Sequence, residues 1–210
     1  MTRALVTGFV PFAGDTANPS GDAVRLLAAS WTGPAELITA ILPVSFDGAA
    51  AALRSLIDEH RPDVVVATGL AGDREGITPE RVAVNLADAR IPDNDGAQPV
   101  DAASIPGAPA AFFATLPVKA IVADLRAAGV PASVSHSAGT FVCNHAMFHA
   151  LHATAQEPGV RAGFVHVPWT TQQRPDAALS IEDVARALAL VLETTLRTPV
   201  DRILVGGALS

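Results

Sequence analysis

The chain has 210 residues, half of them apolar and 17% charged, with a formal net charge of -7. This length fits one large domain, residues 1–210, that buries roughly 70% of its unfolded surface without disulfides or structural metals. Because the acidic excess is accompanied by no basic run, nucleic acid and anionic membranes are poor candidate partners.

Three features of the chain predict a cytoplasmic location. The N-terminal apolar run is interrupted at Pro11 and is too short for the hydrophobic region of a signal peptide. No apolar stretch approaches the ~20 residues that a membrane span requires. Cys143 is the only cysteine, so an internal disulfide cannot form, and nothing points to an oxidising compartment.

Short apolar runs alternate with stretches of helical periodicity along the chain. In chain order we predict a strand at 3–9, a helix at 21–30, a strand at 36–42, a helix at 48–60, strands at 63–70 and 81–86, a helix at 117–128, a strand at 132–135, a helix at 144–154, a strand at 163–167 and a helix at 180–196. Ser180 is the expected N-cap of the last helix, with Asp183 near its third position. The alternation predicts an α/β fold with a mostly parallel sheet covered by helices.

The segment 88–109 departs from this alternation. It contains four prolines and two glycines and has no sustained hydrophobic period. We expect a long loop, and loops of this length in compact domains are usually functional or disordered.

Cys143 is the first candidate for chemistry because it lies between a predicted strand and a predicted helix. A thiol at a helix N-terminus feels the positive end of the helix dipole, which favours the thiolate. Gly139 allows a tight turn just before it, and nearby backbone amides could form an oxyanion hole. The alternative is that Cys143 is a small core residue, as free cysteines often are.

A nucleophilic cysteine needs a base, and the chain has six histidines. His60 ends a helical pattern and is expected in solvent. His145, His149 and His152 have a spacing that could suit a metal. No carboxylate or second cysteine completes that set, so a partly exposed helix face is the favoured interpretation.

His166 and Glu80 are the best candidates to act with a cysteine. His166 lies near the carboxyl end of a very apolar strand, where active sites of open α/β sheets gather. A structural histidine satisfied by backbone groups is the alternative. Glu80 opens a strand-like stretch after a glycine-containing loop, and could either hold the imidazole in one tautomer or pair with Arg81.

Three other patterns resemble ligand sites only superficially. The segment 69–72 follows a strand but lacks GxGxxG spacing, so a dinucleotide site is not expected. The segment 7–14 has two glycines but no Lys-Ser/Thr pair, and is therefore not a P-loop. Asp93 and Asp95 could bind a divalent ion, although turn-forming aspartates are commoner.

Four segments together resemble the type I pyroglutamyl peptidase family, also called pyrrolidone-carboxylate peptidases. They are 7–20 (TGFVPFAGDTANPS), 69–94 (GLAGDREGITPERVAVNLADARIPDN), 137–145 (SAGTFVCNH) and 163–168 (GFVHVP). They occur in the family's order, and the similarity extends from about residue 5 to residue 196. The strings TPER, ARIPDN and GTFVCNH are too long for chance agreement of all three.

This resemblance implies a cysteine exopeptidase that hydrolyses the amide bond after an N-terminal pyroglutamyl residue through a thioester acyl-enzyme. At the matching positions, Cys143 is the nucleophile, His166 the base and Glu80 the residue that orients the base. It also implies a single-domain α/β/α sandwich of phosphorylase/hydrolase-like type, no metal or cofactor, N-terminally pyroglutamylated peptides as partners, and a homotetramer or homodimer.

The resemblance also implies an aromatic substrate pocket. Phe9, Phe12 and Phe141 match the family's aromatic positions, and Asn18 is similar to a residue that organises the pocket loops. A flat, uncharged lactam ring needs apolar walls and a few directed hydrogen bonds, so these residue types suit the implied substrate.

Polar recognition is expected from the backbone and from one arginine. Groups near Leu70 and Val142 are expected to take the lactam N–H and carbonyl, and Arg90 matches a family residue that supports the oxyanion region. Such a site would exclude a free N-terminal ammonium, because burying that charge unpaired costs several kcal/mol.

The chain departs from the family pattern at three positions. Ala13 and Asp73 stand where the family commonly has glycine, and Trp169 follows the His-Val-Pro string. We expect the first two to shift a pocket loop and Trp169 to alter access beside His166.

Two other functions are compatible with parts of the sequence. A nucleoside phosphorylase has a fold similar to this family's, but it would need a phosphate site of arginines and glycines and would not need Cys143. A degenerate homologue would bind pyroglutamyl peptides without cleaving them, and the presence of all three triad residues argues against it.

Overall fold

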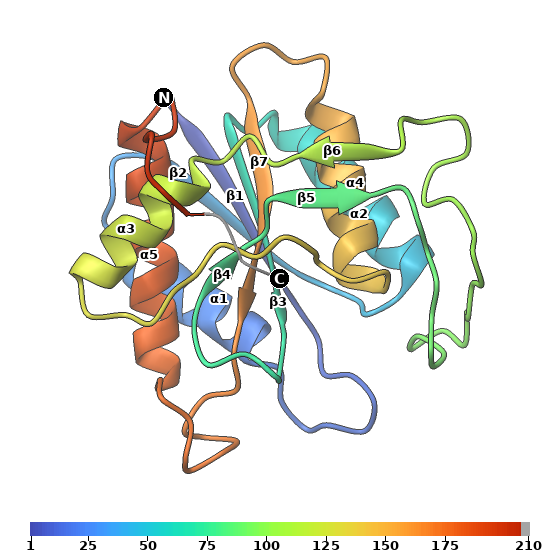
Figure 1. The fold of residues 1–210 in the computed structure, drawn as a ribbon, viewed down its shortest axis with the longest axis horizontal. Helices are drawn as coiled ribbons and strands as arrows, with labels where there is room; N and C mark the ends of the chain where they lie inside the picture. Colours follow the sequence, from blue (N-terminus) through green and yellow to red (C-terminus); the bar gives the residue numbers. More distant parts are fainter. Residues whose placement is uncertain (207–210) are drawn as a thin grey trace.

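The computed structural model describes residues 1–206 and has three layers, with a central sheet between two groups of helices (Figure 1). Its elements in chain order are β1 (Arg3–Phe9), α1 (Pro19–Ser30), β2 (Glu36–Leu42), α2 (Phe46–His60), β3 (Val64–Leu70), β4 (Thr78–Pro79), β5 (Val82–Val84), β6 (Ala111–Phe113), α3 (Val118–Ala127), α4 (Val142–Thr154), β7 (Arg161–Val167) and α5 (Ile181–Arg197). The predicted α/β class is confirmed.

The main sheet brings the carboxyl ends of three strands together at one edge. Its strand order is β2-β1-β3-β7-β4, with β1, β2, β3 and β7 parallel and the short β4 antiparallel to β7. In such sheets ligands bind outside the carboxyl ends of the strands. Phe9, Leu70 and His166 lie at or next to those ends, in β1, β3 and β7.

Each face of the sheet is buried under its own group of helices. Val64 and Val66 of β3 pack in the core beneath α1, α3 and α5. Val65 and Ala67 pack in the core beneath α2 and α4. Because successive side chains of a strand point to opposite faces, a strand covered on both sides must be apolar throughout, which explains the continuous apolar runs of the sequence.

The start of α5 is fixed by the capping residues predicted for it. The Ser180 hydroxyl accepts a hydrogen bond from the Asp183 amide at 3.1 Å, and the Asp183 carboxylate accepts one from the Ser180 amide at 2.9 Å. This reciprocal pair satisfies two amides that a helix start would otherwise leave without partners.

Two predicted strands need correction. The segment 132–135 is not a strand, because only Ala132 and Ser135 form isolated bridges, to Ile77 and Glu80. Ile77 and Glu80 lie on either side of β4. This strand is two residues long and includes Pro79, which has no N–H to extend a ladder. The predicted strand 81–86 shortens to β5, which pairs with β6 in a separate two-stranded sheet.

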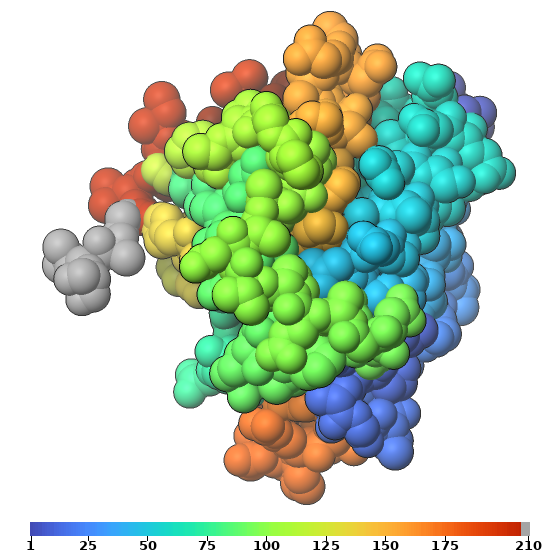
Figure 2. Space-filling view, turned by 90° about the vertical axis from the view of Figure 1, so that its right-hand side faces the viewer, coloured from blue at the N-terminus to red at the C-terminus, as the bar shows by residue number. Residues whose placement is uncertain are grey.

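The segment 88–109 contains no helix or strand, as expected, and spreads over the face of the molecule shown in Figure 2. Asp93 anchors it. One oxygen of that carboxylate accepts hydrogen bonds from the amides of Asp95 at 3.0 Å and Ala97 at 2.8 Å, and the other accepts one from the Phe46 amide at 2.8 Å. Asp93 therefore forms a turn, as favoured from the sequence, and also ties this loop to the start of α2.

Within residues 1–206, the helices are all too short or too polar to cross a membrane.

Candidate active site

His166 and Glu80 form a buried pair at the carboxyl edge of the sheet. His166 is 4% exposed and Glu80 is fully buried. The imidazole Nδ1 lies 2.7 Å from the Glu80 Oε1. Glu80 directly follows β4, which lies beside β7 in register with Thr78 opposite His166. A carboxylate at this distance holds the proton on Nδ1 and leaves Nε2 as the nitrogen available for proton transfer.

The surroundings of His166 keep its imidazole charged. Burial by itself would lower the pKa of His166, but the nearby Cys143 side chain and the Glu80 carboxylate outweigh it and raise the pKa to about 9. At neutral pH the proton therefore stays on the imidazole. A histidinium beside a cysteine is the environment in which a thiolate nucleophile is stable.

Cys143 lies in the first turn of α4, which begins two residues earlier than predicted. The helix begins at Val142, with Phe141 as its N-cap. The sulfur therefore lies at the N-terminal end of α4, where the helix dipole is positive and the first amides have no partner within the helix. Gly139, with φ of 76°, makes the left-handed turn that leads the chain into α4, as its position in the sequence indicated.

Gly69 of β3 provides the space in which the sulfur lies. In the sheet it stands directly opposite His166. A Cβ placed on Gly69 would lie 2.8 Å from the Cys143 Sγ and 2.8 Å from the Cζ of Phe164. Phe164 is fully buried and its ring packs against His166, with centroids 4.8 Å apart. Because Phe164 is fully buried and cannot move aside, an added methyl group would push the sulfur away from its place beside His166.

We therefore expect Gly69→Ala to lower kcat by about 10²-fold, because a displacement of about 1 Å in a reacting group can cost that much. The protein should remain folded, with overpacking of about 1–3 kcal/mol. Steady-state kinetics and a melting curve measure the two effects. Unchanged kcat in a folded variant would contradict the placement of Cys143 against Gly69.

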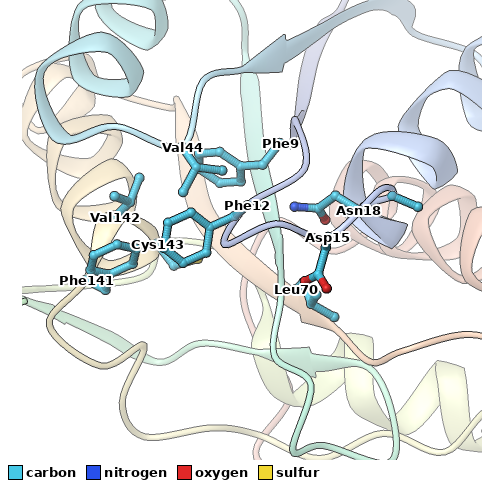
Figure 3. A pocket seen from close by; sticks show the side chains of 10 residues that line it. Phe9, Phe12, Asp15, Asn18, Val44, Leu70, Phe141, Val142 and Cys143 are labelled. Carbon is cyan, nitrogen blue, oxygen red and sulfur yellow. The ribbon is translucent and has the colours of Figure 1, made fainter. Parts of the chain in front are cut away.

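A cavity of about 200 Å³ opens beside Cys143 (Figure 3). Its lining combines apolar side chains from four parts of the chain with two polar ones, namely Phe9, Phe12, Asp15, Ala17, Asn18, Val44, Leu70, Phe141, Val142 and Cys143. The rings of Phe12 and Phe141 pack 5.2 Å apart. The phenylalanines, Asn18, Leu70 and Val142 of the predicted pocket thus all line one cavity with Cys143.

Asn18 organises the loop between β1 and α1. Its Oδ1 accepts hydrogen bonds from the Ser20 amide at 3.1 Å and the Ser20 hydroxyl at 2.9 Å, which caps α1. Its Nδ2 donates to the Val10 carbonyl at 3.0 Å. Because these bonds use both ends of the side-chain amide, Asn18 fixes the shape of the cavity wall.

The arginine in contact with the Glu80–His166 pair is Arg74, which the sequence did not single out. Its Nη1 lies 3.1 Å from the Glu80 Oε1, and the same nitrogen donates to the Thr78 hydroxyl at 2.9 Å. Arg90, the predicted oxyanion residue, is exposed and is not among the residues that line the cavity, so its role stays a prediction. Arg81, weighed as a partner of Glu80, uses its amide to bond the Ser135 carbonyl.

The interpretation of His145, His149 and His152 as a partly exposed helix face is wrong for two of them. His145 and His149 are each 6% exposed, and their ring centroids are 4.4 Å apart. Ser104 of the long loop lies against His149, which explains the burial that α4 alone does not predict. Among residues 1–206 there is no group of three or more histidine, cysteine or acidic side chains placed to hold a metal.

This buried pair should make the protein acid-sensitive. Burial lowers the pKa of His145 and of His149 to about 4, with smaller effects from Arg54 and, on His149, from the neighbouring His145. The unfolded chain binds these protons near pH 6.5, whereas the folded chain resists them. As far as these two histidines are concerned, the free energy of unfolding therefore has its full value above pH 6.5. It falls as the pH drops towards 4.

We expect the melting temperature to drop between pH 6.5 and 4, and the drop to be smaller in His149→Leu, which removes one of the groups. Differential scanning fluorimetry across this range measures both. A native protein equally stable at pH 7 and 4.5, or a variant with an undiminished loss, would refute the role of the pair.

The fold and the site together define a class of protein. A parallel α/β sheet carries a cysteine at a helix N-terminus, a histidine and a buried carboxylate at its carboxyl edge. This arrangement is typical of hydrolases that use a cysteine nucleophile.

Comparison with known proteins gives the family. The family model for pyroglutamyl peptidase matches residues 2–198, and the chain belongs to this family. It is 49% identical over 206 residues to a pyrrolidone-carboxylate peptidase of Streptomyces coelicolor, covering 96% of this chain and 95% of the relative. It is 46% identical over 212 residues to that of Klebsiella pneumoniae, covering 99% of each.

Solved structures of pyroglutamyl peptidases are also similar to this chain. The crystal structure of pyroglutamyl peptidase I from Bacillus amyloliquefaciens superposes with a TM-score of 0.91 at 40% identity, over 96% of this chain and 100% of that one. The pyrrolidone carboxyl peptidase from Thermococcus litoralis gives a TM-score of 0.92 at 39% identity, over 98% and 99%.

Proposed function

We propose that this protein is a cysteine-type omega peptidase that hydrolyses the amide bond after an N-terminal pyroglutamyl residue. The observation that carries the proposal is the 2.7 Å contact between His166 and the buried Glu80, next to a cavity on whose wall Cys143 lies among phenylalanines. The names of the relatives support the same substrate class.

In the first half of the reaction, Cys143 attacks as a thiolate while His166 carries the proton. The sulfur bonds to the carbonyl carbon that links pyroglutamate to the next residue, and negative charge moves to the carbonyl oxygen. The free amides of the first turn of α4 are the donors best placed to stabilise that oxygen. The C–N bond then breaks, the leaving amine takes the proton from His166, and a thioester remains.

In the second half, water replaces the amine. His166, now neutral, takes a proton from the water as it adds to the thioester carbonyl, and the C–S bond breaks to release pyroglutamate. The thiolate and the protonated imidazole are restored. Arg74 and His166 both lie against the Glu80 Oε1, and Glu80 keeps the imidazole in the orientation that both steps require.

The apolar cavity supports the choice of an uncharged ring. Its walls are mainly phenylalanine, valine and leucine side chains, and Asp15, the single carboxylate among its lining residues, is exposed to solvent. A prolyl N-terminus has the same ring size but carries a positive charge, and burial of that charge in apolar surroundings is costly.

Turnover of two matched chromogenic amides tests the proposal. We expect the pyroglutamyl amide to be hydrolysed with a kcat/KM at least ~10²-fold above that of the prolyl amide. Failure to cleave the pyroglutamyl amide, while still binding it, would identify an inactive homologue. Phosphate-dependent release of bases from nucleosides would instead favour the phosphorylase alternative.

Three further expectations accompany this proposal. Chelators should leave the activity intact, because no metal or cofactor is assigned a role. The protein is expected to be cytoplasmic. A homotetramer or homodimer is expected, and light scattering coupled to size-exclusion chromatography measures it.

A further inference from the structure

A second hollow lies next to the cavity described above. It has a volume of about 450 Å³ and lies between the β1–α1 loop and the loop that follows β7. Asp15 and Ala17 line both spaces, so the two are neighbours. Figures 1 and 2 both show the blue loop before α1 and the orange loop before α5 side by side at one end of the molecule.

The second hollow lies where the leaving half of a substrate must go. The leaving amine takes its proton from His166, so the residue that carries this amine lies on the His166 side of Cys143. From His166 the chain runs through Pro168 directly to Trp169, which forms one wall of the hollow. The remaining lining is mostly polar, and Trp169 is the one large apolar surface in it; the other residues are Asp15, Thr16, Ala17, Gln172, Gln173 and Arg174.

Trp169 is held rigidly as a flat apolar surface in this hollow. A Cβ on Gly72 would collide with the indole nitrogen, so the ring lies directly against the chain that leaves β3. The Arg174 guanidinium lies 5.2 Å from the ring centroid and donates to the Gly72 carbonyl at 3.3 Å. These contacts fix the indole without burying it.

Within residues 1–206, Trp169 takes no part in the packing of the sheet. It is half-buried, and it belongs to neither of the two apolar cores that stabilise the sheet. A large aromatic ring on a loop, fixed by its neighbours and open to a hollow, is a typical surface for an apolar side chain of a ligand.

Resting on the proposed function, we propose that this hollow binds the residue that follows pyroglutamate, and that Trp169 makes it favour aromatic or large aliphatic side chains. The selected substrates are thus pyroglutamyl peptides with a bulky apolar second residue. Because the second residue leaves with the amine, its contact with Trp169 acts on acylation and changes kcat/KM.

Selectivity between two substrates provides the test. We expect the native protein to hydrolyse pyroglutamyl-phenylalanine amide with a kcat/KM about tenfold above that for pyroglutamyl-alanine amide. Trp169→Ala should remove this preference, whereas Trp169→Phe should keep most of it. Because both substrates are measured on the same protein, a partly unfolded variant lowers both rates and leaves their ratio unchanged.

Trp31→Phe is the matched control. Trp31 is the only other tryptophan, caps the end of α1 and donates to the Ala35 carbonyl at 2.9 Å, away from the site. Its selectivity should equal that of the native protein. If Trp169→Ala keeps the native ratio while cleaving both amides, the role of Trp169 is refuted and the proposed function stands. If the native protein cleaves neither amide, the proposed function fails together with this inference.

Discussion

Cys143→Ser is expected to lower kcat for a pyroglutamyl amide by at least ~10³-fold, the scale seen when a catalytic triad loses its nucleophile. A serine hydroxyl is far less acidic than a thiol, so it is a much weaker nucleophile beside His166. The substitution is nearly isosteric, and the pyroglutamyl amide should still bind.

The single cysteine of the chain allows a specific chemical control. Because Cys143 is the only cysteine, thiol alkylation reports on that residue alone and should abolish activity in step with the label. Melting curves of native and variant proteins check that the fold is kept. Equal, slow hydrolysis by both proteins would refute the assignment of Cys143 as nucleophile.

Glu80→Gln should cost on the order of 10³-fold in kcat, because loss of the orienting carboxylate leaves the imidazole without a fixed tautomer and without a negative partner. The carboxylate also helps to hold the pKa of His166 at about 9. In the proposed mechanism the leaving amine takes its proton from His166. Native activity should therefore fall as the pH rises through about 9, and in Glu80→Gln this fall should begin at lower pH.

Glu75→Gln is the matched control for this substitution, since Glu75 is an exposed carboxylate only five residues earlier in the chain. Its pH profile and kcat should equal those of the native protein. A purely structural role for Glu80 would lower the melting temperature while leaving the alkaline limb of the profile in place, and this result would contradict its role as orienting group.

Much of the fold follows from sequence periodicity. The four parallel strands are apolar on both faces, and such runs are predictable because helices cover both sides of the sheet. The strand 132–135 was mispredicted because a short apolar run does not reveal whether a partner ladder exists. Here the partner is β4, which Pro79 stops from extending.

The site was predictable in part. The triad positions followed from the resemblance to a family more than from local patterns, because spacing along the chain cannot bring Glu80 to His166 across 86 residues. Arg74 was missed since its contact with Glu80 depends on how the loop before β4 folds back. The burial of His149 was missed because the covering residue, Ser104, belongs to a loop without periodicity.

An affinity label offers the most direct test of the central claim, that Cys143 attacks the carbonyl of a pyroglutamyl group seated in the adjacent cavity. The native protein is incubated with a pyroglutamyl diazomethyl ketone or with its prolyl counterpart, and peptide mass spectrometry locates the adduct. We expect the pyroglutamyl reagent to attach one group to Cys143, a competing pyroglutamyl amide to slow this attachment, and the prolyl reagent to react far more slowly. Inactivation with Cys143 unmodified, or equal labelling by both reagents, would contradict the claim.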